Sequence, residues 1–124
     1  MECGITLMEV LVAIALLAIM AAAGISNLIV ALKTAKYTEV NFAANSLAIS
    51  KVEEISAIDV GNLNSNYNEV ESDVTWPDLA LTFTRTTTIH MNGDDSRTVD
   101  VSVMSNSPDV ATNVTFSTTL ALWE

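Results

Sequence analysis

The chain has 124 residues and a formal net charge of −10, and half of its residues are hydrophobic, with the longest apolar run in the first quarter. About 90 residues follow that run, enough for one small core, so the composition indicates a single small domain attached to an apolar segment. Nucleic-acid binding draws its affinity from cationic side chains that contact phosphates, and five basic residues against fifteen acidic ones do not supply such a surface. Direct nucleic-acid binding is therefore not expected.

The apolar run extends from Ile5 to Leu32, and between Val10 and Ile25 it contains no charged or strongly polar side chain. As a helix, this run would be about 42 Å long, which is enough to cross a hydrocarbon core of about 30 Å. It is therefore predicted to be a membrane-spanning helix.

One acidic residue, Glu9, lies near the start of the run. An ionised carboxylate inside a membrane costs on the order of 2.5 to 3.5 kcal/mol, so such a residue is usually retained for pairing or for proton handling. None of the five basic residues falls within the run. A free α-amino group would serve as the cationic partner of Glu9.

The segment Gly4-Ile5-Thr6-Leu7-Met8-Glu9 resembles the processing site of type IV pilins and type II secretion pseudopilins. In that family a prepilin peptidase cuts after the glycine and methylates the new N-terminus. The glutamate at the fifth mature position then pairs with an N-terminal amine during filament assembly. The resemblance implies cleavage between Gly4 and Ile5, and it assigns assembly to Glu9 together with Thr6. The family usually begins its mature chain with Phe and carries a basic residue in its leader, and this chain has neither.

An ordinary secretory signal peptide is the competing interpretation of this end of the chain. Its apolar core would run from Val10 to Met20, and Ala21-Ala22-Ala23 would form a cleavage site before Gly24. The segment ahead of that core has two glutamates and no base, whereas a signal peptide is positively charged there. On this alternative the chain would be a secreted soluble binding domain.

Residues 33–59 are predicted to continue the helix as an amphipathic half. Apolar residues recur there mostly at spacings of three and four. They are Tyr37, Val40, Ala44, Leu47, Ala48, Val52, Ile55 and Ile58. Polar residues, Lys51 among them, fill much of the rest. Within the apolar half, Gly24 to Asn27 is the weakest helical stretch, and either a local break or a continuous helix with a small-residue packing patch is expected there.

Residues 60–78 are rich in turn-forming residues and are predicted to be a connecting loop, with Trp76 covering the small core. Beyond it, in residues 79–124, the apolar period becomes two, which predicts antiparallel strands. The alternating apolar residues are Leu79, Leu81 and Phe83, then Val99, Val101 and Val103, then Val114, Phe116, Leu120 and Leu122. The expected class is α+β, in which a long N-terminal helix packs on a small three- to four-stranded antiparallel sheet. This arrangement resembles the pilin fold.

Enzymatic catalysis is not expected, because the chain has a single histidine, His90, and its only cysteine, Cys3, falls in the expected leader of residues 1–4. No cofactor is expected apart from calcium, which binds and stabilises the C-terminal loops of several pseudopilin heads that lack disulfides. Carboxylates near two turns can contribute oxygen ligands to such an ion. The candidates are Asp94, Asp95, Asp100 and Asp109.

The resemblance implies a structural subunit of a type IV pilus-like extracellular filament, most like the minor pilins or the pseudopilin I type. Residues 5–32 would be held in the bacterial inner membrane and then packed in the filament core. The expected partners are other copies or other pilins, the prepilin peptidase and the assembly machinery. A type II secretion pseudopilin, whose filament stays in the periplasm, is the alternative.

Overall fold

The computed structural model describes residues 4–93 and 95–122. Its main elements are a helix, α1 (Leu7–Ser56), and four strands: β1 (Glu69–Thr75), β2 (Thr82–Met91), β3 (Ser96–Ser105) and β4 (Asn113–Ala121). The fold is α+β, with one long N-terminal helix packed on a four-stranded antiparallel sheet, as the sequence predicts. The chain divides into two compact units, residues 1–36 and residues 37–124.

Helix α1 is continuous through the Gly24 to Asn27 stretch where the sequence allows a break. The Ser26 hydroxyl donates a hydrogen bond to the carbonyl of Ala22, 3.1 Å away, and so is satisfied within the helix. A serine that bonds back one turn in this way is compatible with helix continuation. The continuous alternative is therefore the one that the structure adopts.

In the second unit, the helix buries one face against the sheet. The buried helical residues are Val40, Ala43, Ala44, Leu47, Ala48, Lys51 and Ile55. Most of the predicted apolar face is confirmed, with Val52 and Ile58 half-buried beside it. Tyr37 is exposed, and its hydroxyl donates to the carbonyl of Asp109 at 3.3 Å. The placement of Lys51 on the polar face was wrong, because its side chain is 6% exposed and lies among carboxylates.

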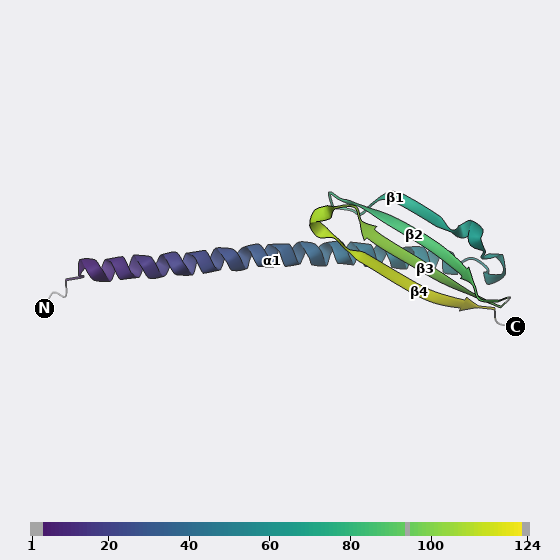
Figure 1. The fold of residues 1–124 in the computed structure, drawn as a ribbon, viewed down its shortest axis with the longest axis horizontal. Helices are drawn as coiled ribbons and strands as arrows, with labels where there is room; N and C mark the ends of the chain where they lie inside the picture. Colours follow the sequence, from purple (N-terminus) through teal and green to yellow (C-terminus); the bar gives the residue numbers. More distant parts are fainter. Residues whose placement is uncertain (1–3, 94, 123–124) are drawn as a thin grey trace. The chain divides into compact units, whose positions relative to one another are not determined.

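The strands lie in the order β1-β2-β3-β4, and Figure 1 shows them side by side across the last turns of α1. The β2–β3 hairpin pairs without interruption from Phe83 opposite Ser105 to Met91 opposite Arg97. Gly93 closes it with φ of 110°, a left-handed conformation that favours glycine. The apolar residues of β3, namely Val99, Val101 and Val103, are fully buried, as their period-two spacing predicts.

The predicted loop at 60–78 is only partly a loop, because Glu69–Thr75 forms strand β1 and two short 3₁₀ helices precede it. The sequence of β1 is polar and acidic, and a bulge interrupts its pairing with β2 between Glu71 and Val74. Both features obscure the period-two signal of a strand. Strand β2 also begins at Thr82, after Leu79 and Leu81. Trp76 is half-buried and packs against the core, as predicted.

Candidate functional site

The segment Gly4–Thr6 is exposed and lies ahead of the helix, so the Gly4–Ile5 peptide bond is outside regular secondary structure. Helix α1 begins at Leu7, and the Thr6 hydroxyl accepts a hydrogen bond from the backbone N–H of Glu9 at 3.2 Å. Thr6 is therefore the helix cap. Threonine followed three residues later by glutamate is the sequence of a capping box, which accounts for Thr6 at this position.

The structure places Glu9 in the first helical turn, with an exposed side chain. A carboxylate there interacts favourably with the positive end of the helix dipole. Within residues 4–93 and 95–122, no lysine, arginine or histidine forms an ion pair with Glu9. The capping sequence explains an acid at this position in water, but it does not offset the cost of a carboxylate in hydrocarbon.

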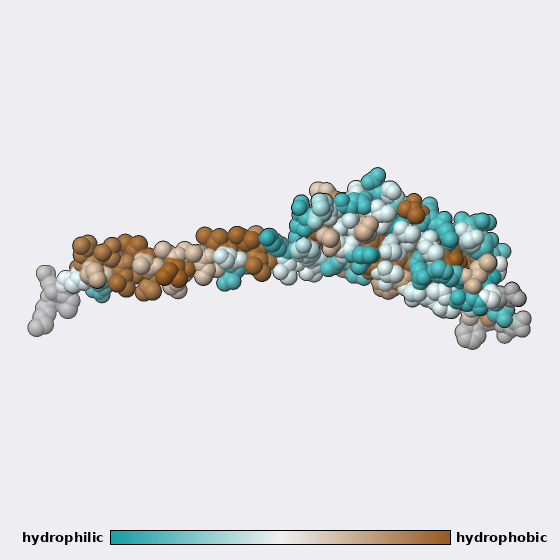
Figure 2. Space-filling view, in the orientation of Figure 1, coloured by the Kyte–Doolittle hydropathy of each residue, from teal (hydrophilic) through white to brown (hydrophobic). Residues whose placement is uncertain are grey.

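Every side chain from Gly4 to Lys36 is exposed, and most of them are apolar. Figure 2 shows this apolar surface in brown along the N-terminal part of α1. Soluble monomers rarely expose a contiguous apolar patch of more than a few hundred Å², and a larger exposed patch is typical of a surface that contacts lipid or another protein. By length and composition, α1 can cross a membrane.

A cluster of five charged side chains, the Lys51–Arg85 cluster, lies where α1 meets β1 and β2. It consists of Lys51, Glu54, Glu69, Glu71 and Arg85. Arg85 binds Glu71 through two hydrogen bonds, Nε to Oε2 at 2.6 Å and Nη2 to Oε1 at 2.8 Å. Its third donor, Nη1, reaches the helix carbonyl of Leu47 at 3.2 Å. The guanidinium thus links both strands to the helix.

Lys51 completes the cluster from the helix side. Its Nζ lies 3.2 Å from Oε2 of Glu69, 3.3 Å from Oε1 of Glu54 and 3.7 Å from Oε2 of Glu71. Burial acts to lower the pKa of Lys51, but the hydrogen bonds to Glu69 and Glu54 and the charge of Glu71 outweigh it and raise that pKa. Lys51 is therefore a charged residue held at the helix–sheet interface.

The hydrogen bonds from Arg85 lower the pKa of Glu71, and the charge of Lys51 adds to the effect. The same bonds raise the pKa of Arg85. All of these shifts favour the charged forms, which is how structural ion pairs behave. The cluster therefore holds β1 and β2 against α1. The sequence carried a signal for the burial of Lys51, which lies four residues after Leu47 and four residues before Ile55 and so shares their face of the helix.

The calcium candidates are not brought together. Asp95 precedes β3 and Asp109 follows it, so the ten residues of that strand separate them. Asp100 lies on β3, with its carboxylate 3.2 Å from Nε2 of the exposed His90. Asp94 lies outside the described residues. In the part of the chain that the structure describes, no group of three or more His, Cys, Asp or Glu side chains could hold a metal ion.

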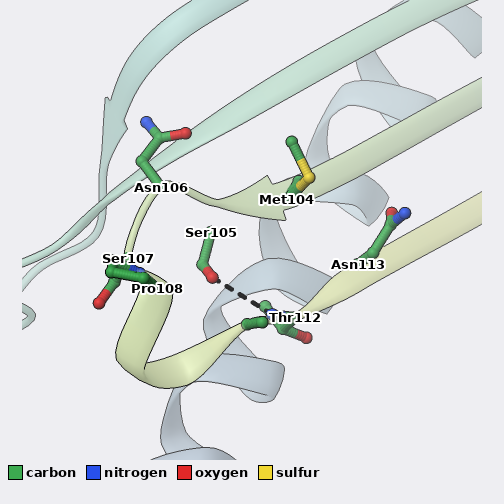
Figure 3. Close-up of a pocket in the computed structure, with 8 residues that line it drawn as sticks. Met104, Ser105, Asn106, Ser107, Pro108, Thr112 and Asn113 are labelled. Atoms are coloured by element: carbon green, nitrogen blue, oxygen red, sulfur yellow. Dashed lines mark hydrogen bonds between the residues drawn. The ribbon is translucent and has the colours of Figure 1, made fainter.

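A shallow pocket lies at the β3–β4 connection, around the 3₁₀ turn Pro108–Val110 (Figure 3). The pocket is lined by Met104, Ser105, Asn106, Ser107, Pro108, Ala111, Thr112 and Asn113. The backbone N–H of Thr112 donates to the Ser105 hydroxyl at 3.2 Å, so the wall is held by local hydrogen bonding. The lining has hydroxyl and amide groups but no ionisable side chain, so it lacks an acid or base for catalysis.

No protein-family model, no curated protein and no solved structure shows a significant match to this chain. Its class therefore rests on the architecture. A long N-terminal helix, exposed and apolar in its first half, packs through its second half on a small antiparallel sheet, which is consistent with a pilin-like fold.

Proposed function

We propose that the protein is a structural subunit of a type IV pilus-like filament, held in a membrane through the apolar half of α1 before assembly. The observation that carries the proposal is the exposed apolar surface from Ile5 to Leu32, with one carboxylate, Glu9, in its first turn. In a membrane lipid covers such a surface, and in a filament the helices of neighbouring subunits cover it.

The start of the helix supports the same proposal. Gly4–Thr6 is exposed and irregular, so a peptidase can reach the bond between Gly4 and Ile5 without unwinding the helix. Cleavage there would create an α-amino group four residues before Glu9. Since Glu9 has no cationic partner among the described residues, the new amino group of a neighbouring subunit supplies the missing charge.

Intact mass with N-terminal sequencing, on protein recovered from its native source, tests the processing step. An N-methylated Ile5 is expected. A start at Gly24 would refute the proposal and make the chain a secreted globular domain, and an unprocessed Met1 in assembled material would refute the assignment of the cleavage site.

Glu9→Gln tests assembly apart from processing. The variant should be cleaved normally and accumulate in the membrane, while filaments sheared from cells should lack it. Glu39→Gln is the matched control, because Glu39 is also an exposed helical glutamate but lies outside the apolar run. Equal recovery of both variants in sheared filaments would contradict the role of Glu9. Filaments retained in the periplasm would identify a secretion pseudopilin.

A further inference from the structure

Two lysines, Lys33 and Lys36, follow the apolar run of α1, and both are exposed. The other basic residues are bound within the head. Lys51 and Arg85 belong to the Lys51–Arg85 cluster, and Arg97 is buried, with its guanidinium bonded to backbone carbonyls. Among the described residues, no carboxylate forms an ion pair with Lys33 or Lys36. These two side chains are therefore open to an external anion.

The two lysines lie on one side of the helix. Residues three apart on a helix are neighbours, and like charges at this spacing repel each other, so an anion that contacts both ammonium groups removes the repulsion. Tyr37 follows directly, and it is 43% exposed. Lysine and tyrosine at the end of an apolar helix are typical of residues that lie among lipid headgroups.

The position of the lysines also fits the membrane thickness. Twenty residues at 1.5 Å each cross a hydrocarbon core of about 30 Å, so residues 13–32 fill the core when Lys33 lies at its surface. Glu9 then lies about 6 Å beyond the opposite surface of the core, outside the hydrocarbon. A shift of four residues in one direction would bring Glu9 into the core, and in the other direction it would bring both lysines into it. The cost of a buried charge therefore favours this register.

We infer that Lys33 and Lys36 bind the headgroup phosphates of anionic phospholipids, at the membrane surface from which the head emerges. Charge complementarity selects an anion, and the position of the lysines at the end of the apolar run selects the lipid phosphate. In a zwitterionic lipid the ammonium group of the headgroup balances the phosphate, so an anionic lipid binds more strongly. This inference rests on the membrane-held state in the proposed function and does not depend on filament assembly.

The charge of the head gives this contact its consequence. Residues 37–124 contain thirteen acidic and three basic residues, so an anionic membrane surface repels the head as a whole. Lys33 and Lys36 supply a local attraction to the same surface just before the head begins. They therefore hold α1 at a fixed depth while the acidic head stays in water.

Fluorescence quenching in lipid vesicles tests the inference on the full chain. A single fluorescent label would be attached beside the lysines through Ala35→Cys, at an exposed helical position, with Cys3→Ser. The vesicles would contain equal parts of phosphatidylcholine and phosphatidylglycerol, with a spin-label quencher on the acyl chain of one lipid or the other. The ratio of the two quenching efficiencies gives the relative association constant. Phosphatidylglycerol should associate at least about fivefold more strongly, the factor expected from one lysine near an anionic surface.

Three double variants show whether the lysines cause this preference. Lys33→Gln with Lys36→Gln should bring the relative association constant close to one, and Lys33→Arg with Lys36→Arg should retain the preference. Asn62→Asp with Asn66→Asp is the matched control, because it makes the same change in net charge at exposed positions of the head. This control should also retain the preference. An equal loss in the glutamine and aspartate variants would overturn the inference.

Extraction of the same vesicles with alkaline carbonate separates the lipid site from the proposed function. Protein that carbonate removes would refute the membrane-held state, and the lipid site with it. Protein that resists carbonate but is quenched equally by both lipids would overturn the lipid site alone. A preference abolished by inorganic phosphate at constant ionic strength would also overturn it, because the lysines would then bind the free anion.

Discussion

Replacing Glu71 with glutamine tests whether the Lys51–Arg85 cluster stabilises the head. Glutamine keeps the shape of the side chain but removes the charge that Arg85 binds through two hydrogen bonds. Removing one partner of a fully buried ion pair costs about 3 to 5 kcal/mol, whereas an exposed pair contributes about 0 to 1 kcal/mol. The side chains of Glu71 and Arg85 are 26% and 12% exposed. Glu71→Gln is therefore expected to lower the free energy of unfolding by an amount between these limits, about 2 kcal/mol.

The loss should also depend on pH. The folded-state pKa of Glu71 is lowered from an ordinary value of 4.5, chiefly by the hydrogen bonds from Arg85. The contribution of Glu71 is therefore fully present above that ordinary value and is lost as the pH falls through the lower folded-state pKa. The difference in stability between the wild type and Glu71→Gln should be constant near neutral pH and should shrink in acid.

Urea unfolding of the full chain in micelles, followed by the fluorescence of Trp76, measures this loss. Trp76 packs against the core, and Trp123→Phe in every variant leaves Trp76 as the sole tryptophan. Glu54→Gln is the matched control, because the Glu54 side chain is 62% exposed and should contribute no more than about 0.5 kcal/mol. Equal losses for the two variants at neutral pH, or a Glu71→Gln loss that does not change in acid, would refute a stabilising role for the cluster.

The same fluorescence assay tests three further substitutions. Thr87→Val should stabilise the head by about 1 kcal/mol, because among the described residues the Thr87 hydroxyl is buried without a hydrogen-bond partner. A less stable variant would show that this hydroxyl does form a hydrogen bond in the folded protein. Val101→Ala should lower the free energy of unfolding by about 2 kcal/mol, because it removes buried apolar surface and leaves a cavity. Val70→Ala should lower it little, because Val70 is 65% exposed, and similar losses for the two variants would contradict the observed core. Gly93→Ala should lower the free energy of unfolding by about 1 to 2 kcal/mol, because Gly93 has a positive φ that alanine disfavours. Gly61→Ala should lower it less, and a larger loss for Gly61→Ala than for Gly93→Ala would argue against this hairpin turn.

Local pattern was sufficient to predict much of the fold. The apolar run to Leu32, the apolar stripe of the amphipathic half and the alternation of Val99, Val101 and Val103 are all periodicities within a single element. An element that buries one face must repeat its apolar residues at its own period, so these features can be recognised without knowing what covers them. Glu9 was recognised as the one carboxylate within that run, whereas the cleavage site between Gly4 and Ile5 was implied by the family resemblance and stays a prediction.

Only the tertiary structure decided the remainder. Strand β1 has an acidic, bulged sequence, and it becomes a strand because β2 supplies the backbone partners that it cannot supply itself. Lys51 is buried because Glu69, 18 residues away, and Glu71 reach it from β1. The positions of β1 and β4 at the two edges of the sheet likewise follow from the strand order, which the spacing within a single strand does not encode. Hydrogen bonds and ion pairs between distant segments depend on which segments meet, whereas hydrophobic periodicity depends only on the element that carries it.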